Sequence, residues 1–130
     1  MRVDTPIFDL LYFFYTNVSK DDLDNHEEYI SLYYNVFSET VSKLGSDPSK
    51  IYPYKVFQNQ WKKYSIMGLL FGLGATRINV TSDAKTLNVI ESIEKGQTMG
   101  EAMWNDAPIN DECKKRMRDI VLHFVENGYI

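Results

Sequence analysis

Histidine and cysteine, which acid–base, nucleophilic and metal chemistry often uses, are scarce in this chain of 130 residues. The two histidines, His26 and His123, are far apart in the sequence and fall on different predicted helices. A metal site or a nucleophile–base pair built on them would need cysteine or carboxylate partners that the sequence does not locate. Cys113 is the only cysteine, so it forms no internal disulfide and no thiolate metal site by itself. It lies on the apolar face of its predicted helix, which is typical of a small core residue. We therefore assign no catalytic residue and no metal ligand.

Asp9 has the most unusual setting of the carboxylates. It is the only charged residue in the apolar run from residue 7 to residue 15. Either this acid is partly exposed in the first turn of a helix, where the helix dipole favours a negative charge, or it is buried and accepts hydrogen bonds from a backbone loop that it holds in place. Both interpretations stay open on these grounds.

The glycines at positions 68, 72 and 74 do not form a phosphate loop. They lack the Gly-Lys-Ser/Thr ending, and Arg77 stands where a dinucleotide fingerprint needs its third glycine. They favour close packing of helices.

The basic run 114–118 has acidic partners one turn away, Asp111 before Lys115 and Glu112 before Arg116, so it predicts a solvated helix face. The nine tyrosines, seven phenylalanines and two tryptophans mostly predict core packing, although they are numerous enough to line an apolar ligand cavity.

Composition excludes several classes of function. The net charge of −4 argues against a nucleic-acid partner, because phosphate affinity depends on clustered Lys and Arg. The longest apolar run, residues 66–75, is half of what a bilayer requires, so it predicts a buried core helix and no membrane partner. No secretory signal is readable, and the single cysteine suits a reducing compartment, so we expect a cytoplasmic protein. The hydrophobic share of 44% supports one compact domain over residues 1–130, with little room for a second core.

The elements that would position these residues are all helices. Thr5 and Pro6 suit the N-cap and first position of a helix that is apolar on nearly every face and therefore buried all round. Residues 17–25 read as a solvated connection. A second helix then follows to Gly45, and a third runs from about Val56 to Arg77. The apolar stripe expected for the second helix comprises Leu23, Ile30, Tyr33, Phe37, Val41 and Leu44.

Two weaker helical patterns lie near 85–95 and 98–105, and a clearer one begins after Asn110 and ends at Gly128. No segment alternates with period two over a strand's length. The sequence predicts an all-α fold. The apolar face expected for the last helix comprises Cys113, Met117, Ile120, Val121, Phe124 and Val125.

Residues 2–15 resemble the Arg-x-x-Ser/Thr-Pro-x-x-Asp-Leu-x-Tyr-Phe-Leu segment of the ecdysteroid kinase-like family, also called CHK kinase-like. This family is a branch of the choline kinase and aminoglycoside phosphotransferase fold. Residues 32–48, ending in Leu-Gly-Ser-Asp-Pro, are similar to a family helix with the same ending, and residues 51–70 and 127–130 follow in family order. The resemblance spans essentially the whole chain.

The resemblance implies ATP-dependent phosphorylation of a small hydroxylated molecule, such as an ecdysteroid, by a full-length family member that binds ATP and magnesium. Family members carry a β-rich lobe, a His-Gly-Asp catalytic loop with a downstream Asn, and an Asp-Phe-Gln metal-binding motif. None of these motifs occurs in the 130 residues. The resemblance therefore implies the C-terminal helical portion of the large lobe of a protein kinase-like fold, with no cofactor of its own. Asp9 matches a family aspartate that supports the catalytic loop.

Two hypotheses follow. In the first, the chain is a C-terminal fragment or truncated paralogue of an ecdysteroid kinase-like phosphotransferase and is not catalytic by itself. In the alternative, it is an autonomous helical module that binds a lipophilic ligand or a protein partner. Apolar surface left open by a missing lobe would also favour self-association.

Overall fold

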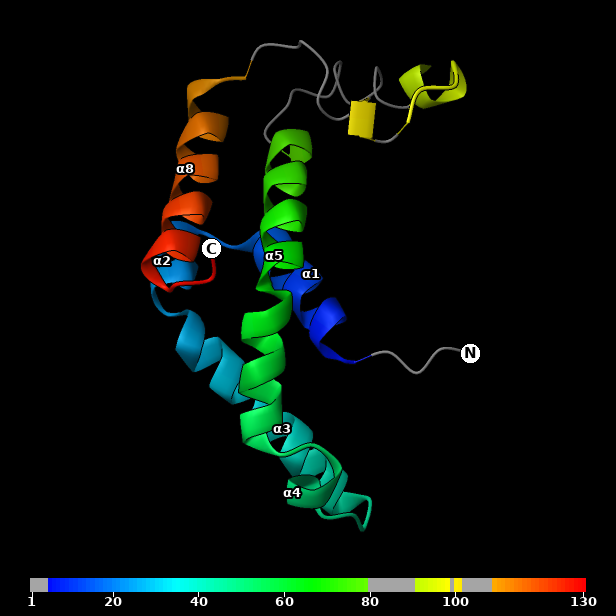
Figure 1. Cartoon of the computed structure of the whole chain (residues 1–130), viewed down its shortest axis with the longest axis vertical. Helices are drawn as coiled ribbons and strands as arrows, with labels where there is room; N and C mark the ends of the chain where they lie inside the picture. The colour runs from blue at the N-terminus through cyan, green and yellow to red at the C-terminus, as the bar shows by residue number, and fades with distance from the viewer. Residues whose placement is uncertain (1–4, 80–90, 99, 102–108) are drawn as a thin grey trace.

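The computed structural model of the chain describes residues 5–79, 91–98, 100–101 and 109–130. Every regular element in these residues is helical, which confirms the all-α prediction (Figure 1). The expected helices near 85–95 and 98–105 lie mostly outside the described residues. The labelled helices are α1 (Ile7–Asn17), α2 (Lys20–Asp24), α3 (His26–Lys43), α4 (Pro48–Ile51), α5 (Tyr54–Asn79) and α8 (Asp111–Glu126).

Local chemistry sets the helix ends as expected. Gly45 follows α3 with φ 81° and Gly128 follows α8 with φ 64°, a left-handed conformation that favours glycine. After α3, the Ser46 N–H donates to the Val41 carbonyl at 3.1 Å, the bond that closes a Schellman motif. At the start of α8, the Asn110 side chain accepts a first-turn backbone N–H at 2.8 Å. These caps confirm both predicted ends and the predicted start.

The expected start of α1 is wrong by one residue. The helix begins at Ile7, and Pro6 takes the cap position with φ −62°. The Thr5 hydroxyl accepts the Ile7 N–H at a long 3.5 Å and donates to the side chain of Gln60 on α5. The N-terminal approach to α1 is therefore tied to α5 by a side-chain hydrogen bond.

The expected solvated connection over residues 17–25 contains the short helix α2. A capping box stabilises its start: the Ser19 N–H donates to the Asp22 carboxylate at 2.8 Å, and the Asp22 N–H donates back to the Ser19 hydroxyl at 3.3 Å. The side chain of Leu23 is the buried one in this helix. The Ser-x-x-Asp spacing was the signal for this turn.

The core forms where α1 packs on α5 and α8 packs beside both (Figure 1). Tyr15 is buried, and it lies against α5 at Gly68 and Gly72, which have no side chain. A Cβ at Gly68 would lie 2.7 Å from Cε2 of Tyr15 and closer still to Cδ2, and one at Gly72 would lie 3.1 Å from the Tyr15 carbonyl oxygen. These contacts confirm the predicted helix-packing role of both glycines.

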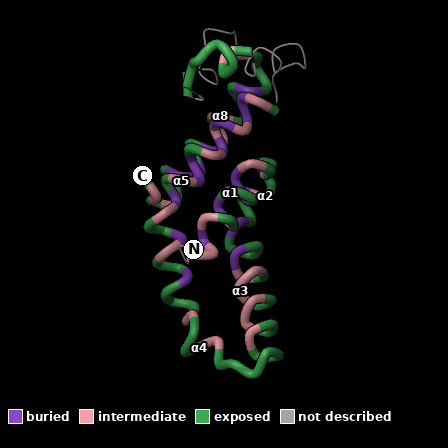
Figure 2. The backbone as a smooth tube through the Cα atoms, turned by 90° about the vertical axis from the view of Figure 1, so that its right-hand side faces the viewer, coloured by how far each residue is buried: buried purple, intermediate pink, exposed green. Residues whose placement is uncertain are grey.

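The predicted apolar faces extend beyond what this core covers. Figure 2 shows buried residues concentrated along α1, α5 and α8, with the lower parts of α3, α4 and α5 largely exposed. Helix α1 is not buried all round, because the side chains of Tyr12 and Phe13 are 57% and 70% exposed. Leu70, inside the run expected to be a buried helix, is exposed as well. No described element covers these sides of α1 and α5.

Other exposed residues correct the expected faces of α3 and α8. Leu44 is 78% exposed because the end of α3 extends past the core. On α8, Val121 and Val125 are exposed, and His123 takes the buried place beside Phe124. The helical period identified the right elements, but the buried stripe of α8 is rotated toward His123.

We expect Gly68→Ala to lower the free energy of unfolding by about 2 kcal/mol, because the new methyl group overlaps the buried ring of Tyr15 and this cost exceeds the gain in helix propensity. Gly100→Ala is the matched control, since nothing lies within 4 Å of a Cβ there. Urea denaturation followed by circular dichroism measures both. Equal stability of the two variants would contradict the packing described.

Candidate functional site

A cleft of about 620 Å³ opens between α1 and α3. We call it the Asp9 cleft. Its walls are mostly apolar, and they contain no Lys, Arg, His or Cys. The lining residues are Asp9, Leu10, Phe13, Phe14, Asn17, Val18, Asp22, Tyr29, Leu32, Tyr33 and Val36.

Helical spacing puts these side chains on facing stripes. Asp9, Phe13 and Asn17 recur every four residues along α1, so they share one side of the helix. On α3, Tyr29, Leu32, Tyr33 and Val36 recur at three or four residues and form the opposite wall. Several of these apolar side chains are exposed, so the cleft is open to solvent in the chain alone.

Asp9 is exposed at the cleft, which decides between its two interpretations for this chain. Its carboxylate makes no hydrogen bond or ion pair to any described residue. Its position in the first turn of α1 is favourable for a negative charge. Burial, followed by the charge of Asp9, raises the pKa of the Tyr33 hydroxyl across the cleft. The expected buried acid with its own donors is not present, because no described loop reaches it.

Asp22, the second carboxylate of the cleft, already has partners. It accepts hydrogen bonds from the N–H and hydroxyl of Ser19 and from the Tyr29 hydroxyl at 3.1 Å. These bonds, the Ser19 backbone donor first, hold the pKa of the Asp22 carboxyl below its usual value. The cleft therefore offers one carboxylate without a donor, that of Asp9. It contains no nucleophile–base pair.

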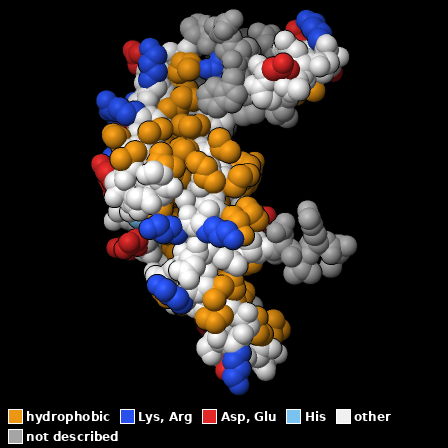
Figure 3. Space-filling model, viewed as in Figure 1, with side chains coloured by type: hydrophobic (Ala, Val, Ile, Leu, Met, Phe, Trp, Pro, Cys, Tyr) orange, Lys and Arg blue, Asp and Glu red, His pale blue; other side chains and the backbone are white. Residues whose placement is uncertain are grey.

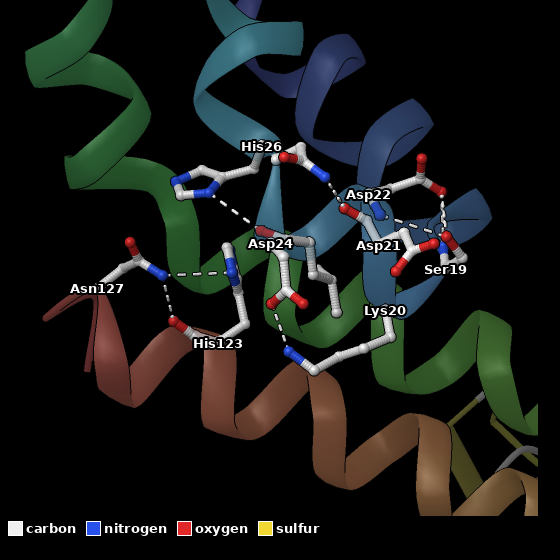
Figure 4. A network of polar contacts seen from close by, with 10 residues as sticks. Ser19, Lys20, Asp21, Asp22, Asp24, His26, His123 and Asn127 are labelled. Carbon is white, nitrogen blue, oxygen red and sulfur yellow. Dashed lines mark hydrogen bonds and ion pairs between the residues drawn. The ribbon is translucent and has the colours of Figure 1, made fainter.

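The structure brings His26 and His123 together, although the sequence does not. Their ring centroids lie 4.5 Å apart in an edge-to-face arrangement, and both residues are buried, with 5% and 4% exposed. Figure 4 shows His26 from the start of α3 and His123 from α8 pointing into the same space beside α2. No group of three His, Cys, Asp or Glu among the described residues is arranged to hold a metal ion.

The hydrogen bonds of His26 fit a neutral ring. Its Nδ1 lies 3.1 Å from the Leu23 carbonyl oxygen, which only accepts, so Nδ1 carries the proton. Its Nε2 then accepts from the Tyr129 hydroxyl at 3.2 Å. The Tyr129 oxygen in turn accepts from the Trp61 indole N–H at 3.2 Å. This chain of donors joins α5 and the C-terminal segment to the start of α3.

His123 has the opposite tautomer. The Asn127 side-chain amide donates both to the His123 carbonyl at 2.8 Å and toward Nδ1 at 3.3 Å, so Nδ1 accepts and Nε2 carries the proton. Nε2 then donates to the Tyr15 hydroxyl oxygen at 3.1 Å. Burial, and then the neighbouring His26, lowers the pKa of His123 to about 4. All four ring nitrogens of the pair have partners, so the pair joins helices and leaves no nitrogen free for catalysis.

The remaining sequence predictions have mixed outcomes. Cys113 is a buried core residue as expected. Arg116 pairs with Glu112 at 3.2 Å as predicted, but Asp111 pairs with Lys114 at 3.6 Å and not with Lys115. Glycines 68–74 lie inside α5, so they form no phosphate loop. Among the described residues, no helix is both long and apolar enough to cross a bilayer.

Sequence reasoning missed one wall of the cleft. The stripe predicted for α3 passes through Ile30 and Tyr33, whereas the wall uses Tyr29, Leu32 and Val36 as well. These three residues have their own spacing of three and four, which is a second apolar stripe on the same helix. A helix with two apolar stripes has more apolar surface than one neighbouring helix covers. This second stripe was the signal in the sequence for a second wall on α3.

Comparison with known proteins points to the same part of the chain. A family model described as the ecdysteroid kinase-like family matches residues 1–46. No curated protein and no solved structure matches the chain. The matched segment covers α1, α2 and α3 and contains every residue that lines the Asp9 cleft. The likeness to this kinase-like family is therefore a likeness of the segment that builds the cleft.

We expect the free energy of unfolding to fall by on the order of 2 kcal/mol as pH drops from about 6.5 toward 4. In this range an unfolded histidine takes up a proton, while His123, whose pKa is lowered to about 4, resists it. His123→Phe, which keeps a ring of similar size, should flatten this dependence and lower stability at pH 7.5, because it loses the bond to Tyr15. Urea denaturation at a series of pH values measures both effects. An equally steep slope between pH 6.5 and 4.5 in the variant would be incompatible with a buried, neutral His123.

Proposed function

We propose that this chain is the C-terminal helical portion of the large lobe of an ecdysteroid kinase-like phosphotransferase, with residues 1–130 forming one segment of that lobe. Its function is to receive the catalytic half of the enzyme on the Asp9 cleft, and it transfers no phosphoryl group by itself. The observation that carries the proposal is the coincidence of the family match over residues 1–46 with the walls of the cleft. The substrate of the assembled enzyme is a small hydroxylated molecule.

The residues of the cleft favour a role in positioning the catalytic half over a role in catalysis. Phosphoryl transfer needs cations to neutralise the phosphates, magnesium ligands, and a carboxylate that orients the acceptor hydroxyl. The cleft holds a single carboxylate without a donor and no Lys or Arg, and the 130 residues lack the His-Gly-Asp and Asp-Phe-Gln motifs of the family. ATP and magnesium are therefore bound by the catalytic half.

The form of the cleft suits a polypeptide segment. Phe13 and Leu32 are exposed on its opposite walls, so covering them removes apolar surface from water. A loop lying between these walls would also bury backbone N–H groups, which must then find acceptors. Asp9 is an acceptor of that kind. By resemblance to the family aspartate, it holds the catalytic loop through such bonds, as a positioning residue.

We expect the pure chain to phosphorylate no alcohol in the presence of magnesium and ATP. A separately produced catalytic half, comprising the β-rich lobe and both motifs of a family member, should gain phosphotransferase activity toward an ecdysteroid when this chain is added. Asp9→Asn should lower that gain about 10- to 100-fold, as loss of charged hydrogen bonds implies. Asp111→Asn, another exposed first-turn acid, is the matched control and should change nothing. Transfer of labelled phosphate from ATP is the readout.

Two results would overturn the proposal. Magnesium-dependent phosphorylation by the pure chain would show that it is catalytic. Saturable binding of a lipophilic probe in the Asp9 cleft, with no response to the catalytic half, would favour the autonomous binding module.

A further inference from the structure

A second apolar surface lies on the other side of the molecule from the Asp9 cleft, on α5 and α8. The exposed large hydrophobic residues there are Ile66, Leu70, Val121, Leu122 and Val125, and we call them the α5–α8 band. Figure 3 shows hydrophobic side chains gathered across these two helices, with Lys and Arg side chains above and below them. All five members are aliphatic.

Two cations at this band are in no ion pair in the part of the chain that the structure describes. Six cations elsewhere or on the remaining face of α8 lie within ion-pair distance of an acid. Lys62 on α5 and Arg118 on α8 are in no such pair among the described residues, and neither are Lys55, Lys63 and Lys115. Helix α5 contains no acidic residue at all. Positive charge on this face is therefore not neutralised by the neighbouring side chains.

The order of residues along each helix puts the cations at the two ends of the band. Lys62, Ile66 and Leu70 recur every four residues on α5, and Arg118 precedes Val121 and Val125 on α8 by one and two turns. The two helices run antiparallel: Cys113 at the start of α8 lies beside Thr76 near the end of α5, whereas Trp61 near the start of α5 bonds Tyr129 beyond α8. Lys62 and Arg118 therefore lie at opposite ends, with the aliphatic side chains between them.

We propose that the α5–α8 band rests on the surface of an anionic lipid bilayer. A surface of this kind takes aliphatic side chains into its headgroup and acyl boundary and attracts Lys and Arg at the edges. The absence of a crossing helix bears only on insertion through a membrane, because lying on its surface requires no long apolar run.

The net charge of −4 does not prevent this contact. Charges more than about 10 Å from the lipid are largely screened at physiological salt, so the cations at the band dominate. Much of the acidic surplus lies on α2 and the start of α3, at residues 21–28. The inference does not depend on the proposed kinase function, since it concerns a different face.

Sedimentation with lipid vesicles tests the proposal on the full chain. The protein should partition onto vesicles of phosphatidylcholine mixed with phosphatidylserine, bind far less to phosphatidylcholine alone, and be released by added salt. Lys62→Gln/Arg118→Gln should lower the partition coefficient about 25-fold, at about fivefold for each cation. Ile66→Ser/Leu70→Ser should lower it at least about tenfold.

Matched controls come from the other end of the molecule. Lys43→Gln/Lys50→Gln removes two paired cations, and Leu44→Ser/Ile51→Ser removes two exposed aliphatic side chains. Both should bind vesicles like the wild type. Circular dichroism checks that all four variants are folded. The proposal is overturned if the wild type binds no vesicle, if binding ignores phosphatidylserine, or if the controls lose as much as the band variants. It is also overturned if the band variants abolish a dimer seen by sedimentation while vesicles are not bound.

Discussion

The arrangement of the helices depends on the burial of one side chain, that of Tyr15. Its ring fills the space that Gly68 and Gly72 leave on α5 and lies against the rings of Trp61 and Phe124 at centroid distances of 5.8 and 4.9 Å. Its hydroxyl oxygen accepts a hydrogen bond from the Nε2–H of His123 on α8. Three helices thus meet at one residue. Burial raises the pKa of this hydroxyl, so it stays protonated and neutral.

The orientation of α1 follows from that contact. With Tyr15 and Leu11 turned toward α5, Asp9 and Phe13 must lie on the other side of the helix. The histidine pair holds the start of α3 against α8, which places the second wall of the Asp9 cleft opposite the first. The cleft is therefore a consequence of how the core closes. The same core leaves the outer sides of α5 and α8 uncovered, where the α5–α8 band lies.

Local rules were enough to predict the long helices and most of their ends, but not the short helices α2 and α4. Gly45, Gly128 and Asn110 act through bonds to the adjacent turn, so their roles can be read from spacing. Periodicity shows which residues share a face, but it does not show whether another element covers that face. For this reason the exposure of Phe13 and Leu44 was not predictable.

Contacts between distant segments account for the other differences. His26 meets His123 only because α8 packs beside α2, and no local pattern encodes that contact. Of the two walls of the Asp9 cleft, the sequence pointed to the α1 wall and not to the α3 wall. Asp9 stood out as the lone charge of an apolar helix, yet its exposure depends on the absence of a covering loop among the described residues. The facing stripe of α3 was present in the sequence, but Tyr29, Leu32 and Val36 lie outside the stripe that was predicted.

The central claim is that the Asp9 cleft is a surface made to be covered by another polypeptide. Hydrogen exchange of the full chain, alone and mixed with the catalytic half of an ecdysteroid kinase-like protein, tests it most directly. The account predicts slower exchange in peptides from residues 9–36, with little change in α5 and α8. Unchanged exchange over residues 9–36, or protection confined to α5 and α8, would contradict it.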